Sequence, residues 1–187
     1  MSEILTINTA ENVFRTLKVD PLPLYDENYY MLKQKMPMYE DALPNPVLNN
    51  LVERMKLTMK TYSGLGLSAN QCGVQVRMFV IGTDQFQFAC INPEVLETSE
   101  ELAKDNEGCL SFPGLFCKIE RPQWIRVRYV TPEGQTVENK LEGLTARCFL
   151  HELDHLNGVR FIDRVGPVAL QMARKKQAKV IKRVTRK

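Results

Sequence analysis

The sequence predicts an α+β fold, because one helical segment precedes a run of strands and two helical segments follow it. Apolar residues recur at helical spacing between residues 45 and 62, and the spacing changes to that of strands between 76 and 141. Helices and strands segregated in this way are typical of α+β proteins, whereas a parallel sheet needs them to alternate. We therefore expect antiparallel or mixed sheets packed around the helix that carries His151 and His155, with a further helix at the C-terminus.

The first helix is expected to run from Asn45 or Asn49 to Tyr62. Its apolar positions follow one helical face, namely Leu48, Leu51, Val52, Met55 and Met59. The glycines that follow it end the helix, because glycine adopts the left-handed conformation at low cost. Before the helix, five prolines between residues 20 and 46 predict an extended or irregular segment.

Several segments in the middle of the chain have the character of strands. They are residues 76–81, 86–91, 95–98, 124–130 and 136–141. A Gly-Thr-Asp turn separates the first two, and the sequence Thr-Pro-Glu-Gly separates the last two. The last two strands are therefore expected to form a hairpin.

Two helices are expected after the strands. The first spans about residues 143–157, and Gly158 suits the left-handed position past its end. The second begins near Pro167, since proline is favoured in a first turn. It continues into a tail that has eight basic residues and no acidic one between Arg174 and Lys187. Such a helix attracts anionic partners, although the same charges would also complement the helix dipole.

Composition predicts one domain over residues 1–187, with residues 1–19 as an N-terminal extension and residues 166–187 as a basic C-terminal helix. No run of eighteen apolar residues occurs, so we expect no membrane span. The first nineteen residues lack the basic and apolar regions of a secretory signal. The five cysteines have no pairing spacing, which favours free thiols and a cytoplasmic protein.

The segment His151-Glu152-Leu153-Asp154-His155 predicts a metal site. It holds the only two histidines of the chain, and their spacing places both imidazoles on one helical face. Glu152 stands where it can take a proton from a water on the metal. Asp154 lies about 300° around the helix from His151 and is expected to be a structural partner at the helix surface. The alternative, two helical histidines beside a surface acid, is disfavoured by this spacing.

A catalytic site of this kind needs a third protein ligand. The extended zinc-protease pattern would place histidine or aspartate at position 161, where this chain has Phe161. No glutamate follows His155, and Asp163 is the only acidic residue after it. The third ligand is therefore either Asp163 at an unusual spacing or a residue upstream. This count disfavours a metallopeptidase that cuts internal peptide bonds.

Two upstream segments complete a recognisable set. Residues 64–71 have the sequence Gly-Leu-Gly-Leu-Ser-Ala-Asn-Gln, and residues 107–111 have the sequence Glu-Gly-Cys-Leu-Ser. Together with the histidine segment, they resemble in order the three motifs of the peptide deformylase family. The resemblance extends from about Pro21 to the end of the chain and leaves residues 1–19 without a functional interpretation.

The resemblance implies a metal bound by Cys109, His151 and His155, with a water in the fourth position. A thiolate and two imidazoles suit such an open site. Taken alone, Cys109 would be expected to be a buried apolar thiol; the missing third ligand argues for the metal role. The family implies Fe²⁺, with Ni²⁺, Co²⁺ or Zn²⁺ as possible substitutes.

The resemblance also implies roles in the hydrolysis of the N-formyl group of formyl-methionyl peptides. Glu152 would act as general base and acid. The Gln71 amide and the backbone N–H of Leu110 would stabilise the charge on the formyl oxygen. Backbone groups of Gly66 and Gly108 would pair with the extended peptide.

An apolar pocket is expected for the methionine side chain. Leu144, Cys148 and His151 share one helical face, and Leu65 is expected to form the opposite wall. Leu144 and Cys148 could equally be core residues. Leu150 departs from the glutamine of many family members, and residues 112–116 contain an aromatic where some members have arginine; both differences concern substrate preference.

Two further possibilities concern partners. Some members of the family bind the ribosome through their C-terminal helix, and the basic tail suits such docking. The alternative to an enzyme is a ribosome-associated metal-binding protein with a deformylase-like fold and little catalysis. A purely structural metal site would have no need of Glu152 or Gln71, which favours the enzyme.

Overall fold

The computed structural model describes residues 20–83 and 86–184. Its helices are α2 (Pro46–Thr61), α3 (Gly143–Leu156) and α4 (Pro167–Val184), with short 3₁₀ turns η1 (Tyr30–Lys33), η2 (Ala69–Cys72) and η3 (Phe161–Arg164). Its strands are β1 (Gly66–Ser68), β2 (Met78–Gly82), β3 (Gln87–Thr98), β4 (Leu102–Gly108), β5 (Phe116–Pro122), β6 (Trp124–Val130) and β7 (Thr136–Glu142). The predicted α+β class is confirmed. The expected extension, residues 1–19, lies outside the described residues.

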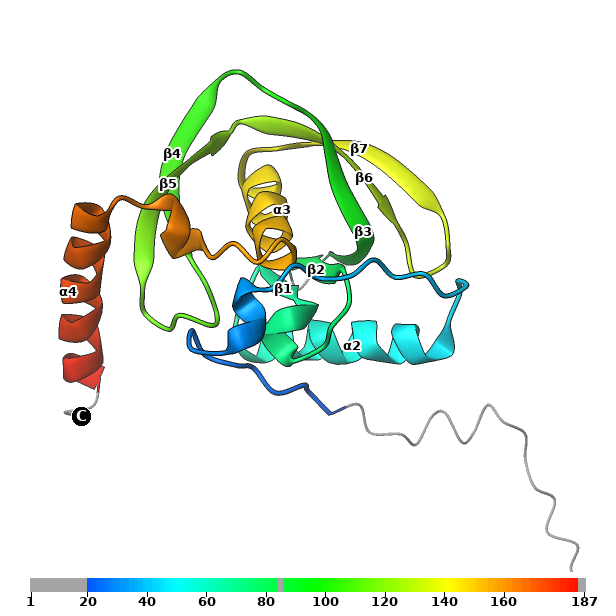
Figure 1. Cartoon of the computed structure of the whole chain (residues 1–187), viewed down its shortest axis with the longest axis horizontal. Helices are drawn as coiled ribbons and strands as arrows, with labels where there is room; N and C mark the ends of the chain where they lie inside the picture. The colour runs from blue at the N-terminus through cyan, green and yellow to red at the C-terminus, as the bar shows by residue number, and fades with distance from the viewer. Residues whose placement is uncertain (1–19, 84–85, 185–187) are drawn as a thin grey trace, which may run out of the picture.

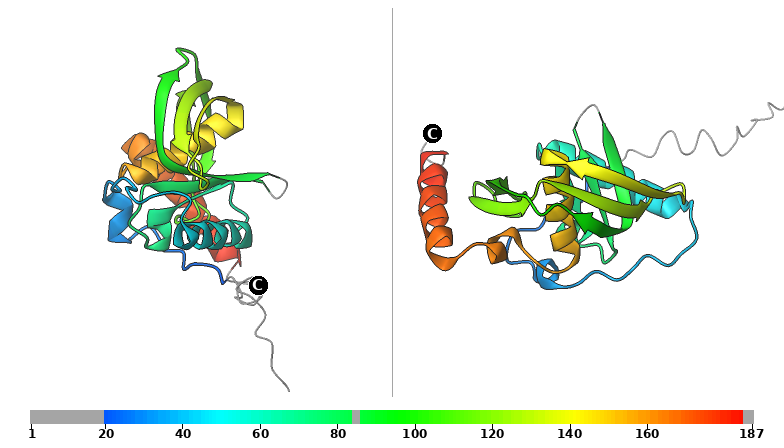
Figure 2. Two further views of the ribbon diagram at one scale, coloured as in Figure 1. Left: turned by 90° about the vertical axis from the view of Figure 1, so that its right-hand side faces the viewer. Right: turned by 90° about the horizontal axis from the view of Figure 1, so that it is seen from above.

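The strands form two antiparallel sheets. Five of them follow the order β1-β2-β3-β6-β7, and β4 and β5 pair only with each other. The sheets surround α3, while α2 lies beneath them (Figure 1). The β4–β5 hairpin stands between α3 and α4, as the right-hand view of Figure 2 shows.

Local sequence explains the helix ends. Asn45 caps α2, because its side chain accepts hydrogen bonds from the backbone N–H groups of Val47 and Leu48. Gly158 follows α3 with φ +74°, and a Cβ there would lie 2.8 Å from the backbone of Lys33. Only glycine fits that position. The start of α2 was left open between Asn45 and Asn49, and Asn45 is the cap; the end of α3 before Gly158 was predicted.

The strands were predicted less completely. The β6–β7 hairpin is confirmed, but the expected strands 86–91 and 95–98 are one strand, β3, with irregular pairing to β6 after Ile91 and Val95. Strands β1, β4 and β5 were not predicted. Residues 102–108 are mostly polar and exposed, so hydrophobic periodicity gives no sign of β4.

Three apolar clusters make the core. One packs α2 against β1 and β2, the second packs α3 against the large sheet, and the third lies under the β4–β5 hairpin beside η3 and α4. Within the part of the chain that the structure describes, no helix has the length and apolarity needed to cross a bilayer.

Candidate metal centre

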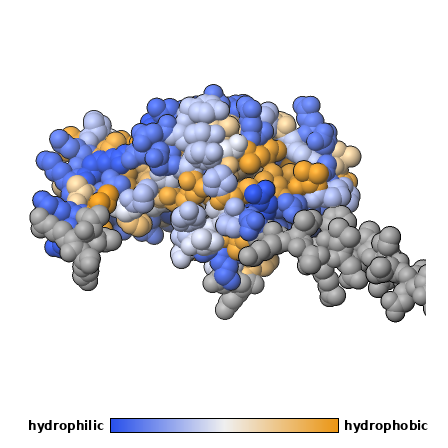
Figure 3. Space-filling model, turned by 90° about the horizontal axis from the view of Figure 1, so that it is seen from below, coloured by the Kyte–Doolittle hydropathy of each residue, from blue (hydrophilic) through white to orange (hydrophobic). Residues whose placement is uncertain are grey.

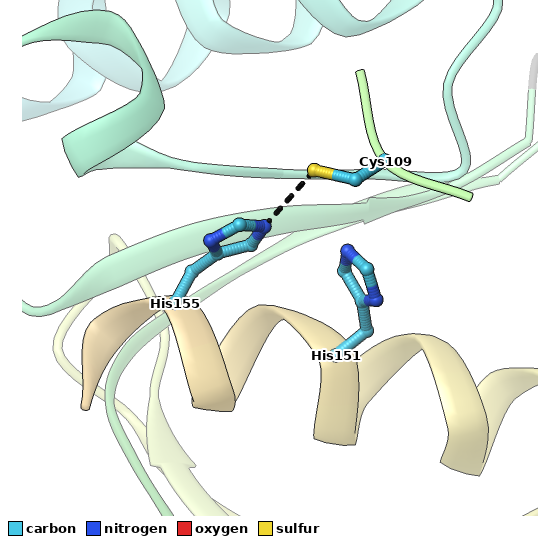
Figure 4. A group of neighbouring side chains, drawn as sticks. All are labelled: Cys109, His151 and His155. Carbon is cyan, nitrogen blue, oxygen red and sulfur yellow. Dashed lines mark hydrogen bonds between the residues drawn. The ribbon is translucent and has the colours of Figure 1, made fainter. Parts of the chain in front are cut away.

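The inner face of α3 carries both histidines. His151 is 8% exposed and His155 is 1% exposed, and their ring centroids lie 5.0 Å apart. One helical turn separates them, so both rings project from the same side of the helix (Figure 4). The packing of α3 inside the sheets therefore buries both imidazoles.

Cys109, the residue that follows β4, faces these histidines. Its Sγ lies 3.2 Å from Nε2 of His155 (Figure 4). One ligand atom from each of Cys109, His151 and His155 falls within 4.8 Å of the others, and no other such group occurs among the described residues. Asp163, the alternative third ligand, lies outside this cluster and pairs with Arg160 at 2.7 Å.

The surroundings of His151 favour positive charge. Burial by itself lowers the pKa of His151, but hydrogen bonds to Cys109 and Glu107 outweigh it and raise the pKa to about 10. His155 behaves differently, because burial and the neighbouring His151 hold its pKa well below the usual value. The hydrogen bonds of His151 therefore favour its charged form, whereas His155 stays neutral. The S, N, N donor set of the three residues fits a divalent metal.

Glu107 is the buried carboxylate behind His151. Nδ1 of His151 donates to its Oε2 at 3.1 Å, and Arg121 donates to both carboxylate oxygens at 2.8 Å. Burial raises the pKa of Glu107, but the hydrogen bonds from Arg121 and His151 outweigh it and hold the pKa well below its usual range. A carboxylate behind a metal-binding histidine fixes the ring and its tautomer.

Two arginines cross between α3 and the β4–β5 hairpin in opposite directions. Arg147 of α3 donates to Glu107 at 2.7 Å and to the carbonyls of Ala103 and Ile119 at 2.7 and 2.9 Å. Arg121 of β5 reaches Oδ2 of Asp154 on α3 at 2.7 Å. We call Glu107, Arg121, Arg147 and Asp154 the arginine latch. Because an isolated two-stranded hairpin is barely stable, the latch helps to fix Cys109 relative to the histidines.

The position of Asp154 corrects the expectation from the helical wheel. It was expected at the helix surface, but it is only 6% exposed and also pairs with Arg164. The β4–β5 hairpin covers this side of α3, and no local pattern predicts that cover because β4 was not predicted. Two arginines compensate the cost of burying its charge.

Glu152 points from α3 toward β1. Ser68 donates to its Oε2 at 2.8 Å, and a Cβ on Gly66 would lie 2.4 Å from its Oε1. Only a glycine at position 66 leaves room for this carboxylate. Burial raises the pKa of Glu152, which His151 and the Ser68 hydroxyl partly offset. A carboxylate with a raised pKa is suited to accepting and returning a proton.

Gln71 lies beside the cysteine. Its Nε2 is 3.4 Å from Sγ of Cys109 and donates to Oγ of Ser111 at 3.1 Å. Its Oε1 accepts from the backbone N–H of Ser68 at 2.9 Å, which fixes the amide orientation. The N–H groups of Gln71 therefore face the side of the cluster where Cys109 lies.

A cavity of about 540 Å³ opens onto this cluster. Every predicted site residue except the fully buried His155 lines it: Leu65, Gly66, Gln71, Gly108, Cys109, Leu110, Leu144, Cys148, His151 and Glu152. Leu65 and Leu144 are 43% and 63% exposed at its edge. Its volume suits a ligand of a few residues.

Sequence reasoning missed Ser68, Glu107, Arg121 and Arg147 as members of the site. Ser68 and Glu107 stand inside two of the three motifs but were given no role. For Arg121 the sequence held a signal. Residues 117–121, Cys-Lys-Ile-Glu-Arg, alternate apolar and charged, and Arg121 falls on the apolar side, which the structure buries while Lys118 and Glu120 are exposed. An arginine on the buried side of such an alternation predicts a buried acidic partner.

Fold and site together define a protein with a candidate catalytic metal centre in a substrate-sized cavity. The model of the polypeptide deformylase family matches residues 21–171, and the chain belongs to that family. Membership makes the protein a hydrolase and implies a catalytic metal.

Known relatives are similar in sequence over most of the chain. This chain is 47% identical over 139 residues to a peptide deformylase of Thermotoga petrophila, and the match covers 74% of this chain and 85% of the relative. It is 37% identical over 177 residues to one of Synechocystis, covering 90% of this chain and 94% of the relative. Among solved structures, the Thermotoga maritima enzyme superposes with a TM-score of 0.75 at 41% identity, covering 79% of this chain and 99% of that one. A Legionella pneumophila deformylase gives 0.80 at 31% identity, covering 89% and 99%.

Proposed function

We propose that this protein removes the N-formyl group from the starting methionine of new polypeptides and releases formate. The observation that carries the proposal is the Cys109, His151 and His155 cluster beside Glu152, at the inner end of a peptide-sized cavity. Membership of the deformylase family supports it. The bond broken is a linear amide, and the catalyst is a metallo-hydrolase.

Cys109, His151 and His155 would hold the metal. When bound, such a metal lowers the pKa of a coordinated water, so that attack on a carbonyl is possible near neutral pH. We propose Fe²⁺ as the natural ion, with Ni²⁺, Co²⁺ or Zn²⁺ as substitutes. Protein prepared anaerobically without added metal should then contain iron; zinc alone would contradict this choice.

Glu152 would move the proton. It accepts one from water as the formyl carbon is attacked, and it donates one to the amine that leaves. The Ser68 hydroxyl holds Oε2 at 2.8 Å, so the carboxylate is fixed before a substrate arrives. Burial keeps its pKa above that of an exposed carboxyl, which helps it to return the proton.

Gln71 and Leu110 would stabilise the negative charge on the formyl oxygen. The Gln71 amide is oriented by its contacts with Ser68 and Ser111, so its N–H groups lie on the side of Cys109 before a substrate arrives. The backbone N–H of Leu110 belongs to a residue that lines the same cavity. Fixed donors of this kind contribute about 10²- to 10³-fold to the rate.

The peptide would lie as an extra strand along β1. Backbone groups of Gly66 and Gly108 would pair with it, in the manner of strand addition. The methionine side chain would then enter the space between Leu65 and the α3 residues Leu144 and Cys148, which all line the cavity. Cys148 is fixed there by its hydrogen bond to the Leu65 carbonyl at 3.2 Å.

Formate release from a short formyl-methionyl peptide tests the proposal. The assay is run anaerobically with protein loaded with Fe²⁺ or Ni²⁺, beside a Glu152→Gln variant loaded in the same way. We expect formate from the parent and a loss of at least about 10²-fold in the variant, with metal content unchanged. A folded, metal-loaded parent that releases no formate would favour the alternative, a ribosome-associated metal-binding protein.

A specific observation also favours docking on the ribosome. The exposed side of α4 carries Lys175, Lys176, Lys179, Lys182 and Arg183, and the end of the molecule where α4 lies shows hydrophilic side chains together with apolar ones (Figure 3). Clustered cations bind RNA phosphates through salt-sensitive attraction. We propose that this face meets the ribosome in the cytoplasm, a compartment that the five free thiols support.

A further inference from the structure

We infer that Asn70 is the positioning residue of His155. Its side-chain N–H groups fix the end of α3, and its side-chain oxygen is the acceptor for the Nδ1–H group of His155 once Nε2 of that histidine holds a metal. This inference rests on the proposed function, in which His155 is a metal ligand. Asn70 does not line the cavity, so it acts through His155 and not on the substrate.

Asn70 joins three segments that are far apart in the sequence. It lies in η2, the turn that also carries Gln71, and it is completely buried. Its Nδ2 donates to the backbone carbonyl of His155 at 2.8 Å and to that of Met31 at 3.3 Å. Met31 belongs to η1, and His155 belongs to the last turn of α3. One amide group therefore holds the helix end from which His155 projects.

Asn70 and His155 each have one side-chain atom without a partner. Among the side chains that the structure describes, three buried nitrogen or oxygen atoms lack a hydrogen bond, namely Oδ1 of Asn70, Nδ1 of His155 and the Tyr39 hydroxyl. Two of these three atoms thus belong to the pair of residues that the 2.8 Å contact joins. An unpaired polar atom inside a protein costs free energy, so its presence requires an explanation.

The two unpaired atoms are complementary when a metal is bound. Nε2 of His155 lies 3.2 Å from Sγ of Cys109, so this nitrogen faces the proposed metal site (Figure 4). A neutral imidazole whose Nε2 binds a metal carries its proton on Nδ1 and is a donor there. The side-chain oxygen of an asparagine only accepts. Metal-binding histidines usually donate this N–H group to a fixed acceptor, which holds the ring and its tautomer.

The two histidines would then have acceptors of different kinds. Nδ1 of His151 faces the carboxylate of Glu107 at 3.1 Å. No carboxylate that the structure describes bonds to Nδ1 of His155. An amide suits this second place because it offers an acceptor to the ring and donors to the backbone at the same time. It also adds no further buried charge, which would be costly without a partner.

Metal affinity tests the role of Asn70 without turnover. Ni²⁺ binding is measured by competition with a chelator. Asn70→Leu is close in size but has no polar atom, and we expect it to bind Ni²⁺ about 10- to 100-fold more weakly than the parent. Asn70→Asp loses the donors but keeps an acceptor, so it should bind Ni²⁺ more tightly than Asn70→Leu. An equal loss in both variants would show that only the donors matter and would overturn the acceptor role.

Thr58→Val is the matched control for a loss of buried hydrogen bonds. Thr58 is also completely buried, and its Oγ1 accepts from the backbone N–H of Leu22 at 2.7 Å. It fastens α2 to the segment before it and lies outside the cavity. This variant should lower Tm, as Asn70→Leu does, but should keep the parent affinity for Ni²⁺. Parent-like affinity in Asn70→Leu, or an equal loss in Thr58→Val, would overturn the inference.

Nuclear magnetic resonance of the parent examines the hydrogen bond directly. The chain has only two histidines, so ¹⁵N-histidine labelling of Zn²⁺-loaded protein gives two Nδ1–H signals to assign. The signal of His155 should lie downfield, as expected for a hydrogen-bonded N–H group, and should move upfield in Asn70→Leu while that of His151 stays in place. A His155 signal at the position of a free imidazole N–H would refute the acceptor role. Absence of formate release by the parent would refute the proposed reaction and leave this result unaffected.

Discussion

Arg121 donates from Nη1 to Oδ2 of Asp154 at 2.7 Å, and this contact joins the hairpin that leads to Cys109 to the helix that carries both histidines. Both side chains are almost completely buried. Glu107 shares the same guanidinium through two further hydrogen bonds. The three proposed metal ligands come from two parts of the chain that only tertiary contacts hold together, so their spacing depends on such bonds.

Replacing Arg121 by methionine should therefore destabilise the protein. Two buried carboxylates, Glu107 and Asp154, would lose a partner, which costs about 3–5 kcal/mol for a buried pair. We expect a corresponding fall in the free energy of unfolding in urea and a loss of metal affinity of about 10- to 100-fold. Arg126→Met is the control, since Arg126 forms an exposed pair with Glu97 and should cost less than about 1 kcal/mol. Equal effects of the two changes would contradict a structural role of the latch.

Glu107 should make the stability of the metal-free protein depend on pH. Its folded pKa lies below the ordinary 4.5, because hydrogen bonds from Arg121 and His151 outweigh burial. The stability it contributes is therefore present above pH 4.5 and is lost as the pH falls toward the folded pKa. Urea unfolding between pH 7 and pH 3 should show a steeper loss below pH 4.5 for the parent than for Glu107→Gln. Parallel curves would mean that Glu107 is not ionised in the folded protein.

Gly66→Ala should damage the reaction without removing the fold. The new Cβ would lie 2.4 Å from Oε1 of Glu152, so the carboxylate must move. Loss of the positioned base should lower kcat by between about 10²- and 10⁴-fold. Gly166→Ala is the matched control, because a Cβ there meets nothing within 4 Å. Formate release at the parent rate by Gly66→Ala would show that Glu152 need not occupy this position.

Metal should stabilise the protein through Cys109. Adding Ni²⁺ to chelator-treated parent should restore formate release and raise Tm, with about 4 kcal/mol of stabilisation at 1,000 times Kd. Cys109→Ser should lose the rise in Tm. Cys117→Ser alters a buried thiol outside the cluster and should keep the rise, although from a lower starting Tm. An undiminished rise in Cys109→Ser would place the metal elsewhere.

Ribosome docking is best tested by charge reversal and not by removal of the tail. Gln177 of α4 is buried and donates to the Pro113 carbonyl at 2.8 Å, so deletion from Lys175 onward would disturb the loop beside the cavity. Lys179→Glu with Lys182→Glu should abolish salt-sensitive co-sedimentation with ribosomes and leave peptide turnover unchanged. The exposed lysines Lys60 of α2 and Lys104 of β4, changed together to glutamate, serve as the control. Docking would be refuted by unchanged co-sedimentation of the α4 variant.

Helices α2, α3 and α4 could be predicted because helical periodicity and end residues such as Asn45 and Pro167 are local features. Strand β4 could not, since its residues are polar and it forms only by pairing with β5. Cys109 was inferred from the order of three motifs. It reaches the histidines because β4 pairs with β5 and the hairpin packs on α3, which sequence spacing does not reveal. The arginine latch depends on the same packing of the hairpin on α3. Its members are 28 residues or more from their partners on the other element, as in Arg121 with Asp154 at 33 and Arg147 with Ile119 at 28, so no local pattern predicts the pairing.

The position of β1 has a consequence for self-association. It is the outer strand of the five-stranded sheet, and an unpaired outer strand can capture any extended chain, including another copy of the same protein. β1 is only three residues long, and Gly66 within it has no side chain to shield the backbone. So short an edge offers too few hydrogen bonds for a stable dimer of sheets, whereas the proposed pairing with the beginning of a new chain needs only a few. Lengthening β1 would therefore be expected to replace transient binding of a new chain with stable sheet-to-sheet pairing between copies of the protein, and so with aggregation.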